Sequence, residues 1–295
     1  HQGYYAVDLV RRVANQPLIN IPAPNRVYFN TVGYDMIHYP AAWVFPLTIL
    51  TVGLAAAVLV AGKRRGHLAW RGVLLGTAAF AACLAVLTGL TVLVSVVSYQ
   101  VRGIYVLYSS DALTLGCVGV TVVGLLFFFR VAARRLGTAN VAAGALCVWA
   151  VLTAGCSTAM PGTSYLFHWP LFGASLGLLV WFLANPAGGR PGGVALAVVA
   201  LGAVPGLLLW AGTLFGLYTC LTIIFAGIVS AGIVLLAGLL APHLALVTER
   251  RLWPLLVPAL VLAAGGFTWG ILWRGFSPEQ PKLSCLAYGL DADTG

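Results

Sequence analysis

The chain has 295 residues, of which 61% are hydrophobic and only 8% are charged. Soluble domains carry about 25% charged residues, so a soluble fold of this length is excluded and we predict an all-α, polytopic membrane protein. The net charge of +9 comes from 16 Lys and Arg residues against 7 Asp and Glu residues. These basic residues fall in short loops between apolar runs, which favours a membrane-topology signal over nucleic-acid binding.

The first forty residues differ from the rest of the chain. Residues 1–16 place apolar side chains at three- and four-residue spacing, which predicts an amphipathic helix. Residues 17–33 contain three prolines and predict a linker with one short strand from Arg26 to Phe29. Because the helix has no partner surface nearby, and the chain opens on His1 and stops at LDADTG, we expect a piece of a longer protein.

The first apolar run sets the orientation of the whole chain. The segment opens with aromatic residues between Tyr34 and Phe45, carries no charge from Ala41 to Gly62, and stops at Lys63, Arg64 and Arg65. About 20 apolar residues cross a bilayer core of about 30 Å, and Lys and Arg favour the cytoplasmic end. We therefore expect the chain to enter the membrane from the extracytoplasmic side.

Seven further runs follow, which predicts an eight-span bundle over 41–273 with both ends extracytoplasmic. The inner loops of this topology hold ten Lys and Arg residues, whereas the outer loops between spans hold only Arg102, as expected for basic cytoplasmic loops. The boundaries between 205 and 225 are the weakest, because Pro205 and nearby glycines could break a helix. The predicted spans are 41–61, 72–97, 111–130, 139–157, 169–184, 193–212, 218–247 and 253–273.

Few residues in these spans carry chemistry. Asp111 could form an ion or proton relay with Arg102, Tyr99 and His168, but we favour an interfacial carboxylate at a helix N-terminus, because a relay needs acids deeper in the bilayer. The relay would suit a transporter or channel-like module, which is the alternative function. It would also require a polar path, and the spans offer Ser, Thr and Gly but hardly any charge.

Metal and nucleophile sites receive little support from the pattern. His38 and His168, with Asp35 or Asp111, lack the closely spaced ligand pairs of zinc sites. We expect both histidines to be interfacial and half in water. Five of the six cysteines lie in apolar runs and are interpreted as small buried hydrophobic residues. The residues Ser157, Ser164 and Ser175 have no acid or base close in sequence, which argues against a serine nucleophile.

The loop from Pro161 to Phe172, PGTSYLFHWPLF, is the most distinctive in the chain. It could be a lid or docking surface beneath an outer domain, or a Pro-Gly turn that leads into an interfacial aromatic belt. The sequence leaves these two interpretations open. The docking interpretation gives a third function, that of a structural module that binds a partner through this loop.

Four stretches resemble the multipass members of the M28 zinc metallopeptidase family. HQGYYAVDLVRRVAN resembles the end of the peptidase domain, and NRVYFNTVGYDMIHYP resembles the approach to the membrane, with Val27 to Asn30 and the pair Tyr39 and Pro40 in the matching places. PGTSYLFHWPLF is similar to a loop of the same proteins, and SCLAYGLDADTG to the start of their further outer domain.

The resemblance implies a domain division and an activity. Residues 1–16 would be the last helix of a peptidase domain, 17–40 a linker and interfacial segment, 41–273 the membrane domain, and 274–295 the start of a truncated extracytoplasmic domain. In the family, two zinc ions are held by His, Asp and Glu, and a Glu is the general base on a metal-bound water. The resemblance places all of them upstream of His1, so we expect no catalytic, cofactor or metal residue here. Its partners would be the lipid bilayer and its own peptidase domain, which alone would meet a peptide substrate; no nucleic acid is expected.

Overall fold

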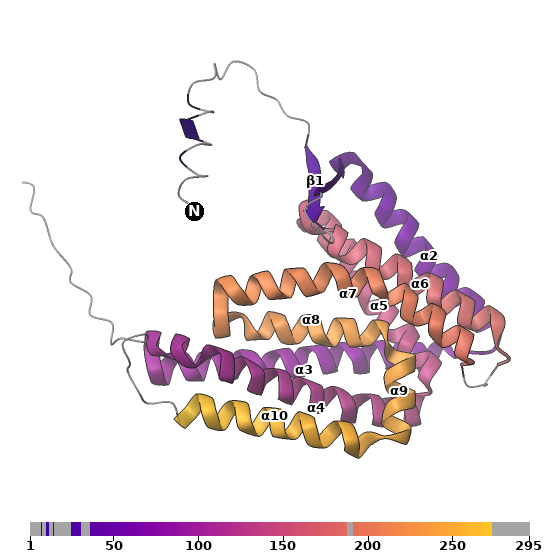
Figure 1. Ribbon diagram of the computed structural model, residues 1–295. Coiled ribbons are helices and arrows are strands. Elements are labelled where there is room, and N and C mark those ends of the chain that lie inside the picture. Colours follow the sequence, from indigo (N-terminus) through magenta and orange to yellow (C-terminus); the bar gives the residue numbers. More distant parts are fainter. Residues whose placement is uncertain are drawn as a thin grey trace, which may run out of the picture.

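The structure, a computed structural model, describes residues 25–30, 36–187 and 191–272, together with Val7, Val10, Arg11 and Ala14. Within this part, a short hairpin is followed by a bundle of apolar helices (Figure 1). The predicted all-α membrane architecture is confirmed in its coarse form, because seven of the described helices are long and apolar enough to cross a membrane. The predicted helix over 1–16 and the tail over 274–295 lie outside the described residues.

Most predicted spans agree with the helices of the structure within a few residues. The largest differences occur where no charge marks an end. The helices are α2 (Val44–Arg64), α3 (Trp70–Arg102), α4 (Ser110–Leu136), α5 (Thr138–Ala159), α6 (Tyr165–Ala184), α7 (Gly193–Leu221), α8 (Ala226–Leu239), α9 (Ala241–Arg250) and α10 (Leu252–Leu272), and short 3-10 turns lie at Ala41–Trp43, Gly103–Ser109, Pro161–Thr163 and Thr222–Phe225.

The region from 205 to 225 corrects the prediction. Helix α7 runs through Pro205 to Leu221, so the sixth span does not end at 212 and the seventh does not begin at 218. The chain then reverses, and α8 meets α9 at a bend of 87°. Counted as one broken span, the α8–α9 pair brings the total to eight; counted apart, the described chain has seven.

The segment before the first span is also more ordered than a linker. The predicted strand is confirmed as β1 (Arg26–Asn30), and it pairs antiparallel with β2 (Met36–Pro40), which the sequence analysis did not predict. In β1 the side chains alternate, so that Val27 and Phe29 are buried. The hairpin therefore has one face against the bundle and one face free.

Glycines allow the closest helix contacts in the bundle. Helices α4 and α10 run antiparallel, and a side chain at Gly266 would collide with the backbone of Gly116 and Ala112. Helices α6 and α7 approach in the same way at Gly173 and Gly202. Membrane helices depend on such small residues, because lipid gives no hydrophobic drive for helix association.

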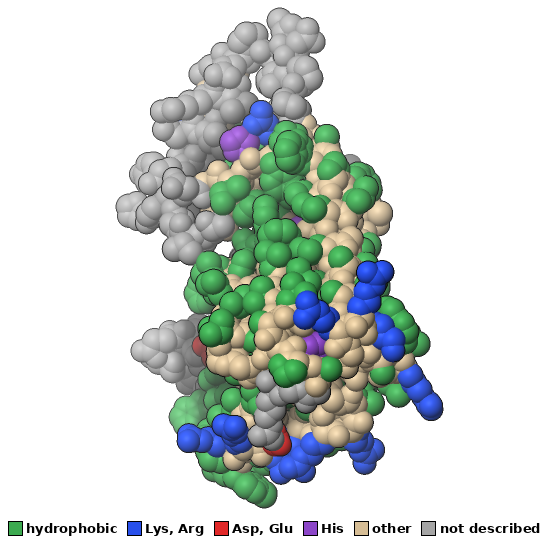
Figure 2. Space-filling model, turned by 90° about the vertical axis from the view of Figure 1, so that its right-hand side faces the viewer, with side chains coloured by type: hydrophobic (Ala, Val, Ile, Leu, Met, Phe, Trp, Pro, Cys, Tyr) green, Lys and Arg blue, Asp and Glu red, His purple; other side chains and the backbone are tan. Residues whose placement is uncertain are grey.

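The basic residues gather at one end of the molecule, which we call the basic end. Helices α2 and α4 finish there, with Lys63, Arg64, Arg134 and Arg135 in their last turns. Figure 2 views this end and shows Lys and Arg side chains spread across it. The hairpin and the first residues of α2 and α6 lie away from it (Figure 1).

One basic residue has a structural role that its position in a predicted loop did not suggest. Arg130 lies within α4, not after it, and its guanidinium donates a hydrogen bond to the carbonyl of Thr248 at 2.6 Å. Thr248 is in the last turn of α9, where exposed carbonyls favour a cation. Arg130 thus holds the bent helix α9 against α4.

Candidate functional site: a buried polar cluster beneath the hairpin

Three polar side chains from different helices meet one turn below the hairpin. Thr48 of α2, Ser157 of α5 and His168 of α6 form what we call the polar cluster. The Thr48 Oγ1 atom lies 2.8 Å from Nε2 of His168 and 2.7 Å from Oγ of Ser157. The Ser157 Oγ lies 3.2 Å from the same Nε2 atom. Each residue is separated from one end of its helix by a single turn or less, so the cluster joins these ends.

The turn between α5 and α6 creates this arrangement. The chain leaves α5 at Ala159, makes a 3-10 turn over Pro161–Thr163, and starts α6 at Tyr165. The amide of His168 donates to the carbonyl of Ser164 at 3.0 Å, so the histidine sits in the first turn of α6. This reversal places Ser157 and His168 side by side although eleven residues separate them.

His168 is only 1% exposed, so the expectation that its side chain is half in water is wrong. The three contacts form a continuous chain when His168 Nε2–H donates to Thr48, Thr48 donates to Ser157, and Ser157 donates to the carbonyl of Thr153 at 2.7 Å. In this arrangement Nδ1 is an unprotonated acceptor, and it has no partner among the residues that the structure describes. The side chain is therefore held at one ring nitrogen only.

The chemistry of the cluster is limited by its burial. Ser157 and His168 are a hydroxyl and a base in contact, which the sequence analysis missed, because their proximity depends on the reversal between helices. However, both are 1% exposed, and the hydrogen bonds of His168 in the structure include no carboxylate to orient the ring. A nucleophile needs a substrate within reach and an oriented base. We therefore interpret the cluster as a polar connection between α2, α5 and α6.

The hairpin lies directly over the start of α6. The ring of Phe29 stacks on Tyr165 with centroids 4.5 Å apart and planes 10° from parallel, and Phe29 also packs edge-on against Tyr39. Burial raises the pKa of the Tyr39 hydroxyl above its usual 10, which keeps the phenol neutral. A cavity of about 410 Å³ adjoins this contact, between the hairpin, Tyr165 and Leu208 of α7.

The loop 161–172 is mostly helical. Only its first residues form a turn, and α6 begins at Tyr165, four residues before the predicted span. The Pro-Gly turn is thus confirmed, and the segment behind it is part of the bundle. Tyr165 of this segment stacks on Phe29, so the hairpin packs on the start of α6.

Asp111 occupies the position we favoured, in the first turn of α4. Its side chain is exposed and accepts a hydrogen bond from the hydroxyl of Tyr218 on α7. The partners of His168 are Thr48 and Ser157, so the structure does not join Asp111 and His168 in a relay. Tyr99 is 49% exposed, and the side chain of Arg102 lies outside the described part.

The other proposed metal residues also lie apart. His38 is exposed on β2 and stacks on Tyr28, with ring centroids 5.9 Å apart, while Asp35 falls outside the described residues. Within the part of the chain that the structure describes, no three His, Cys, Asp or Glu side chains come close enough to hold a metal ion. The structure therefore does not bring the described candidates His38, His168 and Asp111 together as a metal site. The described cysteines (Cys83, Cys117, Cys147 and Cys156) are free thiols and are buried or half-buried.

Comparisons with protein-family models, with curated proteins and with solved structures each gave no match.

Proposed function

We propose that this chain is the membrane domain of an M28-type zinc-dependent peptidase, and that it holds the peptidase domain at the extracytoplasmic surface. The observation that carries the proposal is the fixed hairpin ahead of the first span. The M28 assignment itself depends on the four sequence stretches that resemble the family.

The hairpin would attach the preceding domain rigidly to the bundle, in place of a flexible linker. Its residues Val27 and Phe29 are 1% and 7% exposed, and the amide of Ala41 donates to the carbonyl of Asn25 at 3.0 Å. A domain that precedes Asn25 would thus be joined to an element fixed on α6 at the Phe29 and Tyr165 rings. The polar cluster stabilises the helices on which the hairpin packs, since it connects α2, α5 and α6 beneath it.

The charge distribution supports the orientation in this proposal. With the basic end in the cytoplasm, the hairpin lies on the extracytoplasmic side, and the preceding domain lies there with it. In this proposal the chain supplies position, and the upstream domain supplies the zinc ligands and the general base.

The alternative is a transporter or channel-like module without peptidase activity. Its best support is His168, an ionisable side chain buried in a helix of membrane-spanning length, because such residues mark ion and proton paths. Towards the basic end, the hydroxyl groups of α5 donate to backbone carbonyls of the same helix, from Ser157 to Thr153 and from Thr153 to Trp149, and these hydrogen bonds include no second ionisable side chain among the described residues. The anchoring role is therefore the function that we favour.

The test compares this chain with the same protein extended upstream through its full reading frame. Zinc content and aminopeptidase activity are measured on both, purified in the same detergent. The proposal expects zinc and activity in the extended protein and neither in this chain. Stoichiometric zinc in this chain alone, or an extended protein with neither zinc nor activity, would contradict it; the second result would make transport the next assay.

A further inference from the structure

An apolar groove runs between α3 and α4 on the surface of the bundle. It has a volume of about 590 Å³ and is lined by twelve residues, eleven of which are apolar or glycine. Small side chains on α3, among them Ala79, Ala82 and Cys83, leave the hollow. Val86 and Phe127 on its rims are 65% and 48% exposed, so the groove opens sideways, to what is lipid in a membrane.

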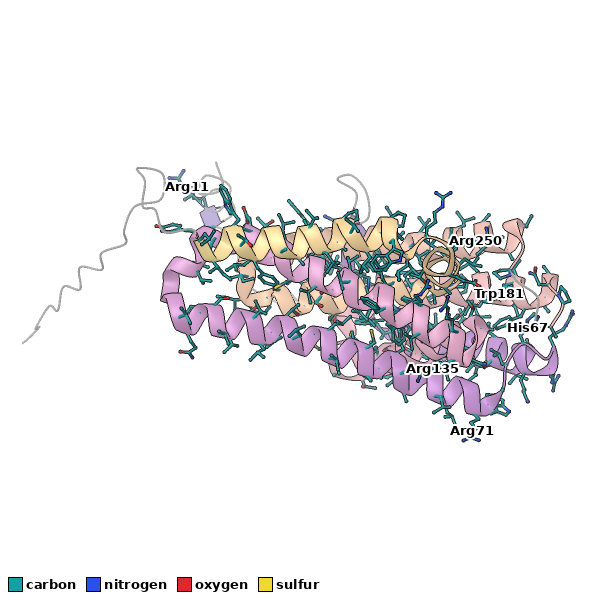
Figure 3. All side chains as sticks on the ribbon, turned by 90° about the horizontal axis from the view of Figure 1, so that it is seen from below. Arg11, His67, Arg71, Arg135, Trp181 and Arg250 are labelled. Carbon is teal, nitrogen blue, oxygen red and sulfur yellow. The ribbon has the colours of Figure 1, made fainter. Side chains whose placement is uncertain are left out.

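The one charged residue of the groove is at its basic end. Arg135 lines it in the last turn of α4, and its side chain is exposed. In Figure 3, Arg135 and Arg71 (at the start of α3) lie at the same end of the molecule. Asp111 and Glu249 are the only acids among the described residues. Asp111 is at the opposite end of α4 and Glu249 is outnumbered at this end by Lys63, Arg64, Arg134 and Arg135, so positive charge dominates here.

The length of the groove matches one leaflet. From Arg135 to Gly124 it follows α4 for eleven residues, which is about 17 Å at 1.5 Å per residue. The hydrocarbon of one leaflet is about half of the 30 Å core, or roughly 15 Å. An acyl chain that starts at the level of Arg135 would thus end near Gly124.

We propose that this groove binds one anionic phospholipid from the leaflet that borders the basic end, with an acyl chain along α3 and α4 and the headgroup phosphate at Arg135. Basic pockets between helices on the cytoplasmic side are known to select anionic headgroups. The apolar lining gives the affinity for the chain, and Arg135 gives the preference for negative charge. The proposal goes beyond the anchoring role and does not depend on it.

The test uses native mass spectrometry of the purified chain with an equimolar mixture of phosphatidylglycerol and phosphatidylcholine that carry identical acyl chains. The unaltered protein should retain one phosphatidylglycerol in preference to phosphatidylcholine. R135Q should weaken phosphatidylglycerol retention about fivefold, the contribution of one basic residue near an anionic surface, and should leave phosphatidylcholine unchanged. A82L, which fills the groove, should lower retention of both lipids.

Two neighbours serve as matched controls. Arg134 and Ala81 are exposed but do not line the groove, so R134Q and A81L should change retention less than twofold. Equal losses in R134Q and R135Q would overturn the proposal in favour of a general basic surface. Unchanged retention in A82L, or no preference between the two lipids, would also overturn the proposal. A dimer of the unaltered chain that A82L abolishes would overturn it too, because a second copy would then occupy the groove.

Discussion

The indole N–H of Trp210 donates a hydrogen bond to the carbonyl oxygen of Leu166 at 2.8 Å. In an α-helix that carbonyl would accept from the amide four residues later, but residue 170 is proline and has no N–H. Helix α7 thus supplies the donor that α6 lacks, and no water in a bilayer could replace it. Trp210 also packs edge-on against Phe167 and Trp149, with centroids 5.5 Å and 6.1 Å away.

This relationship predicts a coupling between two substitutions. W210F should lower the free energy of unfolding by about 1–3 kcal/mol, because it leaves the buried Leu166 carbonyl without a donor. In a P170A background the new amide at 170 can donate instead, so the cost of W210F should fall by about half or more. A double-mutant cycle on chemical unfolding in detergent measures the coupling. Equal costs in both backgrounds would show that the indole contributes through packing alone.

The apolar runs were sufficient to predict most of the helices. The fourth span was predicted at 139–157 and is found at Thr138–Ala159, because Arg134 and Arg135 on one side and a Pro-Gly turn on the other limit it. Between 193 and 247 no charge interrupts the run. There the turn after Leu221 and the bend at Leu240 depend on how α7, α8 and α9 pack, which hydropathy does not contain.

The polar cluster could not be predicted from the sequence, because it too depends on how the helices pack. Thr48 and His168 are 120 residues apart. They are in contact only because the starts of α2 and α6 lie beside the end of α5. The hairpin gave a partial signal. Its first strand was predicted from Arg26 to Phe29, while the residues of β2 resembled an interfacial aromatic stretch.

The packing of the hairpin on α6 gives a second prediction. F29A removes the ring that stacks on Tyr165, and aromatic contacts of this kind contribute about 0.5–1.5 kcal/mol beyond buried area. Hydrogen exchange at the amide of Ala41 and across β1 and β2 should therefore accelerate about tenfold or more, while exchange in α4 stays unchanged. Y28A is the control, because Tyr28 is 53% exposed on the opposite face of the same strand. Equal acceleration in both variants would mean that Phe29 does not fix the hairpin.

His168 gives a third prediction, which separates a structural from a transport role. H168F should lower the free energy of unfolding by less than about 1 kcal/mol, since interhelical hydrogen bonds in membranes average about 0.6 kcal/mol. Thr48 keeps its hydrogen bond to Ser157, and Ser157 keeps its bond to the carbonyl of Thr153, while the unpartnered Nδ1 disappears. H168D, which buries a carboxylate, should be worse by about 2.5–3.5 kcal/mol. A large loss in H168F would show that the histidine itself holds the three helices.

The contact between α4 and α10 gives a fourth prediction, and adjacent glycines supply its control. G266L should destabilise the bundle by about 1–3 kcal/mol or more, because the added side chain meets the backbone of α4 at Gly116. G265L should change the unfolding midpoint little, since nothing lies within 4 Å of a side chain added there. Matching losses would indicate that α10 does not dock closely on α4.

The proposed orientation is tested by labelling from one side of the membrane. In a background without the native cysteines, M36C on the hairpin should react with a membrane-impermeant maleimide in intact cells. K63C at the basic end should react only after the membrane is opened. Both positions are exposed in the structure, so a difference in labelling reports the side of the membrane and not burial. Labelling of K63C in intact cells would reverse the topology, and it would place any domain that precedes the hairpin in the cytoplasm.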